Sequence, residues 1–550
     1  MRKDKFFVFL TFFLFGFLFL HFAKNMLAVR PDGWYVGQVN LYGDLVFHLG
    51  FINKFLESGQ VFAQNPVYPA DKPNYPIFAD FVTSQIAKVT GVDFSLFITT
   101  FVMGIIVIYV ARLFIRIFIK NEKVVFLALL LFFVNGGLGF HFLLSDFQNS
   151  QKSIFDFFIS LPREYTDVKD QGYWWINTYL AYFLPQRGFL FAFPITLTVF
   201  ALLYRGFVKK NLPFLILAGL LAGILPLVQA HSLFVIFVIS TLFFAAAALR
   251  FKKDKKKIPG WFLFAATTAL VALPMFNSIS SDTNFLKFAK VDYGWTSEEN
   301  IVWFWLKNLG LFGPVLLMSL FWLYKKNRHF FFLYIPAAAI FALSNIFVFQ
   351  PWEFDNSKLL IYWFFASCIV VAYFLHDQFF SESTIKKFIG AIFVFFMIFS
   401  GGLDIFRTFT KVTYYQIFTG EDLKVAQAVK NLTAKDSIFV TAPVHNHPIP
   451  ALSGRSTLVG FHGWLWSHGI DYLERASDVE RIYQGGEEAE SLIRKYKINY
   501  VAYGPHEREN FSINVSYFQK YPKIPLSSDW IVYDVSNLWA DADRQNLPRN

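Results

Sequence analysis

The chain is dominated by long runs of apolar residues that are separated by polar segments. A run of about 18 or more mainly apolar residues is long enough to cross a membrane as a helix. The first run follows four charged or polar residues at the N-terminus and also has the length of a signal peptide, but Ala23-Lys24-Asn25 is a poor cleavage site. We therefore expect a retained first helix and predict eleven spans: 6–23, 95–119, 124–141, 188–206, 213–230, 232–249, 261–278, 301–324, 330–349, 359–377 and 388–406.

Basic residues gather on one side of these predicted spans. The connections on that side carry 21 Lys and Arg residues against five acidic ones. Basic loops resist translocation, so this side is predicted to be cytoplasmic, with the N-terminus inside and everything after the last span outside. These six connections are 1–5, 112–123, 205–212, 250–257, 325–329 and 377–387.

The composition supports a multi-pass protein of the plasma membrane. Of the 550 residues, 55% are hydrophobic and only 16% are charged, below the roughly 25% of soluble domains. The single Cys excludes a disulfide framework and every metal site built from several cysteines. The net charge of +11 would suggest nucleic acid in a soluble chain, but here it follows from the basic cytoplasmic connections. We expect no nucleic-acid partner.

The chain changes character after residue 406. The segment 407–550 carries 16 basic and 16 acidic residues, and its apolar runs are short. Strand-like stretches at 437–441, 457–460, 499–504 and 530–535 alternate with helical patterns near 471–483 and 487–496. The predicted fold is thus an α-helical polytopic membrane domain over 1–406, followed by a small extracytoplasmic α/β domain over 407–550.

The first outer loop, 24–94, contains the most informative polar residues. Asp44 and His48 are four residues apart and would share one helix face, while Phe47, Phe51 and Phe55 would form a separate apolar stripe. Such a helix would lie in the membrane interface and present a carboxylate at the outer surface. An alternative is that Asp44 only caps the helix, which Gly43-Asp44 would suit.

A proline-rich stretch follows within the same loop. Asn65 to Pro76 contains four prolines, which forbid a helix and force an extended, turn-rich path. Its aromatic residues, Tyr75 among them, are unusual in flexible linkers. We expect a folded loop that covers a site and that includes Tyr75 and the nearby Asp80.

Other polar residues lie at the outer ends of predicted spans, where ionisable groups need a partner, a cavity or a function. Arg187 would either reach a lipid phosphate or bind a phosphate of a substrate. His231 lies in a very short outer turn, where a lone His is usually a surface residue. The segment 350–358 places Glu353, Asp355 and Lys358 together, either in a solvated turn or on the floor of a cavity.

These segments resemble the GT-C class of integral-membrane glycosyltransferases. This class includes the catalytic subunit of oligosaccharyltransferase, the protein O-mannosyltransferases and the aminoarabinose transferases. The likeness rests on eleven spans, on a long first outer loop that begins with an acidic residue and on an outer C-terminal domain. It also rests on short segments that are similar to motifs of the class: 44–80, Leu184-Pro185-Gln186-Arg187-Gly188, 352–358, Ser453-Gly454-Arg455, Gly463-Trp464, Glu474-Arg475 and 478–483.

The resemblance implies a reaction at the outer face of the membrane. The donor would be a sugar on a polyprenyl phosphate, and the acceptor a glycan, lipid or protein. Asp44 would be the general base, with His48 beside it, and Arg187, Lys358 and His231 would hold the leaving phosphate. Members of the class often have a second acidic motif that binds a divalent metal. The nearest matches here are Asp167-Val168-Lys169-Asp170 or Glu353 with Asp355, so metal dependence stays open.

Two other functions are compatible with the sequence. A transporter or flippase of lipid-linked sugars would need charged or Gly/Pro-broken spans, whereas the polar residues here crowd one face. A non-catalytic scaffold gives no reason for Asp44, Arg187 and Lys358 to lie on one side. The segment 407–550 also holds five of the eleven His residues, for which zinc binding, acceptor recognition and packing over the first outer loop are the candidate roles.

Overall fold

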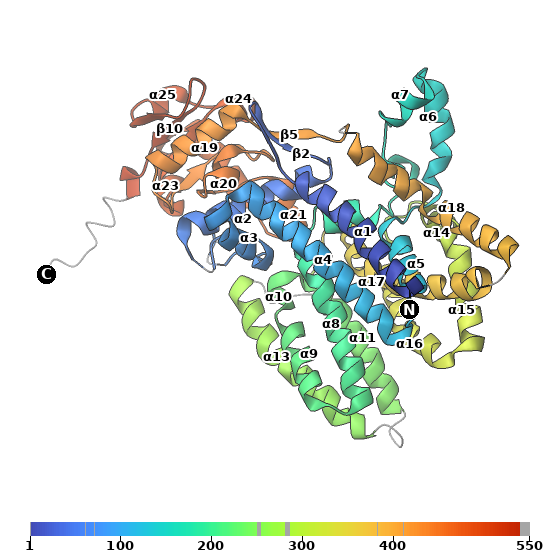
Figure 1. The fold of residues 1–550 in the computed structure, drawn as a ribbon. Coiled ribbons are helices and arrows are strands. Elements are labelled where there is room, and N and C mark those ends of the chain that lie inside the picture. Colours follow the sequence, from blue (N-terminus) through green and yellow to red (C-terminus); the bar gives the residue numbers. More distant parts are fainter. Residues whose placement is uncertain are drawn as a thin grey trace.

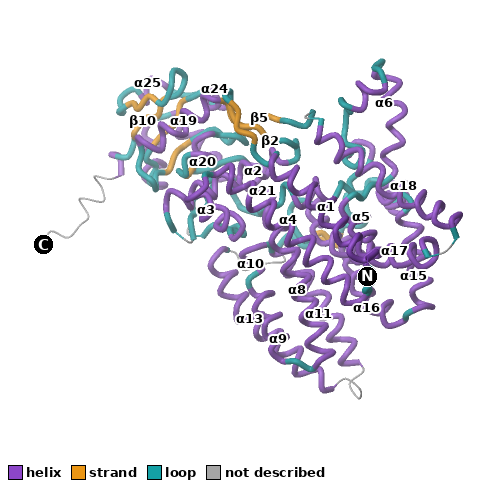
Figure 2. The backbone as a smooth tube through the Cα atoms, viewed as in Figure 1, coloured by secondary structure: helices purple, strands orange, loops and turns teal. Residues whose placement is uncertain are grey.

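The computed structural model describes residues 2–539 except 61, 71, 250–254, 281–286, 382 and 411. Helices make up most of it, and the strands gather mainly at one end (Figure 2). Among the described residues, seven helical segments are long and apolar enough to cross a membrane. They contain α1 (Arg2–Lys24), α4 (Val92–Phe118), α8 (Arg187–Lys209), α11 (Ala230–Leu249), α13 (Ile258–Ile279), α17 (Ser357–Leu375) and α18 (Thr384–Phe409).

Two further apolar segments are sharply bent. The helix α5 (Glu122–Phe133) and the segment Leu138–Ser150, which ends with α6 (Phe142–Ser150), meet at 65°. The pair α14 (Ile301–Leu309) and α15 (Phe312–Lys326) meets at 96°, next to Gly310. Gly310 has a φ of +58°, which a glycine adopts at no steric cost. With each pair counted as one span, the described part of the chain has up to nine.

Two shorter apolar helical segments complete the membrane-like part. They are Leu212–Val228, which contains α9 (Leu212–Gly223) and α10 (Leu225–Val228), and α16 (Arg328–Ser344). Each of the eleven predicted apolar runs therefore falls mainly on helical structure, although residues 134–137 and the end of the run 330–349 are not helical. In Figure 1, α8, α9, α11 and α13 form a bundle that points away from the C-terminal part of the chain.

The segment after α18 folds around a five-stranded sheet. Its strand order is β7 (Ser456–Thr457), β6 (Ile438–Val440), β8 (Tyr500–Tyr503), β10 (Ile531–Asp534) and β9 (Lys523–Pro525). The β6 strand pairs in parallel with β7 and β8, and β10 is antiparallel to both of its neighbours. The β6, β8 and β10 strands coincide with predicted ones, whereas β7 shares only Thr457 with the predicted strand 457–460. The helices α22 (Leu473–Gln484) and α23 (Gly486–Tyr496) coincide with the predicted helices.

This C-terminal segment, called the tail below, is joined to the first outer loop. The strand β5 (Tyr415–Thr419) pairs with β2 (Gly33–Val36), which also pairs with β1 (Ala28–Arg30). The proline-rich loop is folded, as predicted, because the carbonyls of Pro66 and Val67 accept hydrogen bonds from the Thr457 and Gly460 amides. In Figure 1 the tail lies beside α2 (Leu41–Ser58) and α3 (Phe78–Thr90).

A buried arginine of the tail holds the end of α2. Arg455 donates hydrogen bonds to Glu57 of α2 and to the carbonyls of Lys430 and Thr433. Its neighbour Gly454 has a φ of +72°, and a Cβ there would lie 2.7 Å from the Asn53 carbonyl oxygen. The predicted motif Ser453-Gly454-Arg455 therefore lies in close contact with α2.

Candidate functional site

The helix α2 carries Asp44 and begins earlier than the capping hypothesis required. Its N-cap is Asn40, so Asp44 lies in the first turn and the hypothesis that Asp44 caps the helix is wrong. The apolar stripe of this helix also does not face the membrane interface. Phe47, Phe51 and Phe55 are at most 3% exposed, because α3 and the tail cover the stripe that was expected to face the membrane interface.

The carboxylate of Asp44 is the least engaged acidic group in this region. Asp44 is half-buried, and no hydrogen bond or ion pair joins its side chain to another residue in the described part of the chain. Burial raises the pKa of Asp44 above its ordinary value and Asp355 adds to this, while the charges of His48 and Lys358 oppose it. The structure thus brings Asp44, His48, Asp355 and Lys358 together from segments about 310 residues apart.

The segment 352–358 contributes one ion pair to this cluster. Lys358 Nζ lies 2.9 Å from Asp355 Oδ2, and both side chains are largely buried. Glu353 is directed elsewhere and pairs with Lys290 at 2.9 Å. Within the described residues, no group of three or more His, Cys, Asp or Glu side chains is arranged to hold a metal ion, so Glu353 and Asp355 as metal ligands stay a prediction.

His48 belongs to a second, fully buried polar chain. Its Nδ1 is hydrogen-bonded to Asp80 Oδ2 at 2.9 Å, and Asp80 Oδ1 lies 3.9 Å from Arg187 Nε. Arg187 is 1% exposed and donates hydrogen bonds of 2.7 Å to the hydroxyls of Thr83 and Thr99. Arg187 therefore does not reach lipid headgroups, which excludes one of its two predicted roles.

Tyr75 and His231 border the same region. The Tyr75 ring packs on Phe47 and on Phe51, and burial raises the pKa of its hydroxyl well above the ordinary value. His231, half-buried at the start of α11, lies near Gln350, Lys358 and Asp355. The structure thus gathers eight of the nine predicted site residues, and Glu353 is the exception.

The tail adds residues that sequence reasoning did not assign to the site. The His468 ring packs against Phe47 and Tyr75, with centroid distances of 5.0 and 4.9 Å. It feels the charges of Lys358, Asp355 and His48, and burial lowers its pKa to about 3. The only signal in the sequence was the number of histidines in the tail, one of whose expected roles was packing over the first outer loop. That packing is observed.

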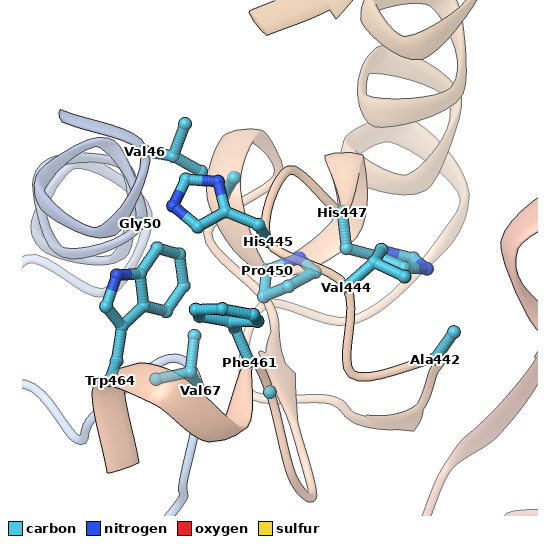
Figure 3. Close-up of a pocket in the computed structure, with 12 residues that line it drawn as sticks. Val46, Gly50, Val67, Ala442, Val444, His445, His447, Pro450, Phe461 and Trp464 are labelled. Atoms are coloured by element: carbon cyan, nitrogen blue, oxygen red, sulfur yellow. The ribbon is translucent and has the colours of Figure 1, made fainter. Parts of the chain in front are cut away.

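The pair His445 and His447 points in two directions. His447 Nε2 is hydrogen-bonded to the buried Glu507 at 2.8 Å, whereas His445 Nε2 donates to the Gly43 carbonyl at 3.0 Å. The two rings therefore do not converge on one metal ion. A small pocket of about 10 Å³, room for about one water, lies between α2 and this part of the tail. Figure 3 shows His445, Phe461 and Trp464 around it, with Val46 and Gly50 on the α2 side.

A second group of acidic residues lies next to the residues that precede α2. Glu164 accepts hydrogen bonds from the side-chain amides of Gln38 and Asn40, at 3.1 and 3.3 Å. Burial and the nearby Asp167 raise the pKa of Glu164 to about 7, against the opposing charge of Arg407. Asp167 itself pairs with Lys169 at 3.5 Å. The first acid of the candidate motif Asp167-Val168-Lys169-Asp170 is therefore already bound to a residue of the protein.

No protein-family model matches the sequence, and a comparison with curated proteins found no significant match. Solved structures do match. A crystal structure of ArnT from Cupriavidus metallidurans bound to undecaprenyl phosphate has a TM-score of 0.54 and 11% identity, covering 97% of this chain and 99% of that one. Its apo form gives 0.52 and 10%, covering 97% and 98%. The chain shares its fold with ArnT.

ArnT is an aminoarabinose transferase of the GT-C class, so the resemblance expected from the sequence is confirmed for the fold. An oligosaccharyltransferase from Archaeoglobus fulgidus, tethered to an acceptor peptide, also matches at a TM-score of 0.48 and 11% identity, covering 90% of this chain and 69% of that one. Together with the apolar helices, the fold identifies a multi-pass membrane protein.

Proposed function

We propose that this protein is a membrane glycosyltransferase that moves a sugar from a polyprenyl-phosphate donor to an acceptor at the outer membrane face. The observation that carries the proposal is the carboxylate of Asp44, half-buried and without a partner among the described residues, at the centre of a polar cluster in an ArnT-like fold. Charged groups in water-poor sites are normally paired, so an unpaired one is a candidate for contact with substrate.

Asp44 is the proposed general base. Its carboxylate takes the proton of an acceptor hydroxyl while the hydroxyl oxygen forms a bond to the anomeric carbon of the donor. The bond between this carbon and the phosphate oxygen breaks, and the phosphate leaves with the electron pair. Lys358 and His48 oppose the effect of burial on Asp44 and so favour the ionised form that a base requires.

The leaving phosphate needs cations rather than an acid. Lys358 is the proposed main contact, because its side chain is 19% exposed and its charge reaches both Asp44 and His231. His231, half-buried nearby, is the proposed second contact. Arg187 already donates to Thr83 and Thr99, so we propose that it mainly supports His48 through the carboxylate of Asp80. Its Nε–H has no hydrogen-bond partner among the described residues and is the only group that we assign to a substrate contact.

The proposed topology has eleven spans. The seven long helical segments, the two bent pairs and the two shorter apolar segments account for that number. The N-terminus would be cytoplasmic, and the first outer loop and the tail extracytoplasmic. A reporter fused after Lys257 should then be cytoplasmic and one fused after Asn550 external, whereas a cytoplasmic Asn550 fusion would refute this orientation.

Radiolabelled undecaprenyl-phosphate sugars, given as a panel to the purified protein in detergent, test the activity. Release of label from the lipid by the wild type, but not by Asp44→Asn, supports the transferase. Movement of intact donor across a liposome membrane without cleavage would instead show a transporter. Binding of donor with neither outcome would favour the scaffold.

A further inference from the structure

Two hydrogen-bond donors of the tail converge on one backbone carbonyl of α2. His445 Nε2 donates to the Gly43 carbonyl oxygen at 3.0 Å, and Trp464 Nε1 donates to the same oxygen at 3.2 Å. In an α-helix this oxygen also accepts the amide of residue 47. Gly43 directly precedes Asp44, so the tail is attached to the helical turn that carries the candidate base.

Ring contacts fix the same turn from both sides. His445 is stacked on Tyr42 with a centroid distance of 4.0 Å, and Trp464 packs on Phe47 at 5.1 Å. His445 and Trp464 also lie against each other at 4.8 Å. These two side chains therefore contact the residues on both flanks of Asp44 without touching its carboxylate in any described interaction.

We propose that His445 and Trp464 are positioning residues that hold the first turn of α2 and thereby set the place of the Asp44 carboxylate. This inference rests on the proposed function and assigns the tail a part in the transfer step. A displacement of about 1 Å in a reacting group can reduce a rate by ~10²-fold, so two hydrogen bonds to this turn are enough to matter.

The state of His445 suits this task. Burial lowers its pKa to about 4, so the imidazole is neutral and carries a single N–H, which the Gly43 carbonyl occupies. Its other ring nitrogen is buried without a hydrogen-bond partner in the described part of the chain. That nitrogen belongs to a residue that lines the small pocket, and one water there would satisfy it.

The first test measures the turn itself and needs no substrate. In His445→Phe/Trp464→Phe both donors are lost while aromatic packing is kept. Amide hydrogen exchange in a peptide that covers residues 42–48 should become about tenfold faster, because the turn loses two hydrogen bonds. The matched control is His462→Phe. His462 belongs to α21 (His462–Ser467), the helix that also carries Trp464, but its ring stacks on Tyr472 rather than on α2. Unchanged exchange in the double variant would overturn the inference.

The second test asks whether these residues act through Asp44. With the donor that the wild type cleaves, the double variant should lose about 10²-fold in kcat while KM for the donor stays within twofold. His445→Gln keeps an amide donor and should recover part of the rate. In the Asp44→Asn background the same two substitutions should change the residual rate less than about twofold, because the group they position is already absent.

The outcomes separate this inference from the function on which it rests. A normal transfer rate in the double variant, or a full 10²-fold loss on top of Asp44→Asn, overturns the positioning role and leaves the transferase intact. If the wild type cleaves no donor, the transferase proposal falls and so does the catalytic part of this inference. Unfolding midpoints of all variants within a few degrees of the wild type show that the comparison is between folded proteins.

Discussion

Two groups of acidic residues lie near the start of α2, and they differ in whether their carboxylates are engaged with other residues of the protein. In the Glu164 group, Glu164 accepts from Gln38 and Asn40, while Asp404 of α18 accepts from the Tyr165 and Thr166 amides and from the Thr166 hydroxyl. In the Asp44 group, Asp355 pairs with Lys358, and Asp44 has no partner among the described residues. Burial alone therefore does not distinguish the proposed base from a carboxylate that is engaged with its own protein. What sets Asp44 apart is that none of the described residues donates a hydrogen bond to its carboxylate.

The largest expected effect is on the rate of transfer. Asp44→Asn keeps the shape of the side chain but cannot accept a proton, so transfer should fall by ~10²–10⁴-fold. The unfolding midpoint should stay within a few degrees, since no described hydrogen bond is lost. Asp93→Asn, which removes an exposed acid from the first turn of α4, is the control for loss of charge at a helix start. A normal rate in Asp44→Asn would show that Asp44 is not the base, and the two groups would then not differ in function.

The Glu164 group should respond in the opposite sense. Asp404→Ala leaves two buried backbone amides without an acceptor, which should lower the free energy of unfolding by about 3 kcal/mol. Transfer per folded molecule should stay near the wild-type rate, measured after correction for the folded fraction. If Asp404→Ala were stable but inactive, the Glu164 group would have a role in the transfer reaction rather than in the stability of the fold.

A third prediction concerns the acid limb of the pH–rate profile of kcat/KM. A base with a raised pKa works only above that pKa, so the rate should rise with pH at a point above the range of an ordinary aspartate. Lys358 lowers the pKa of Asp44 and Asp355 raises it. Lys358→Met should therefore move the limb to higher pH, and Asp355→Asn should move it to lower pH. Identical limbs in both variants would mean that another group is titrating.

The smallest effect is on the pH dependence of stability. The pKa of Glu164 is raised in the folded state to about 7, so the folded protein binds more protons than the unfolded chain between about pH 4.5 and 7. Its contribution to stability is therefore lost as the pH rises through this window. Glu164→Gln should flatten this part of the curve of unfolding midpoint against pH. A curve parallel to that of the wild type would show that Glu164 titrates normally.

The sequence predicted the parts of this architecture that depend on local pattern. Apolar runs located the membrane-like helices, and alternation located three of the five tail strands and touched a fourth at one residue. The pattern around Asp44 and His48 predicted a helix there, and α2 contains both residues. It misjudged the surroundings of that helix, since an apolar stripe that faces protein and one that faces a membrane look alike in sequence.

Long-range pairings were beyond the reach of such patterns. The contacts of His48 with Asp80 and of His445 with Gly43 span 32 and 402 residues. Nothing in the local sequence distinguishes His445, which holds α2, from His447, which holds Glu507. The capping hypothesis failed for a similar reason, because α2 begins at Leu41 and only the fold around Asn40 sets that start.

The pairing of β5 with β2 has a consequence for how the protein is made. Strand β2 lies within the first 40 residues of the chain, whereas β5 and the donors to Gly43 belong to the last quarter. A ribosome therefore releases the helices and the first outer loop well before the part that fixes the turn around Asp44. We therefore expect the turn around the candidate base to be held only after the tail, which is synthesised later than α2, has folded against it.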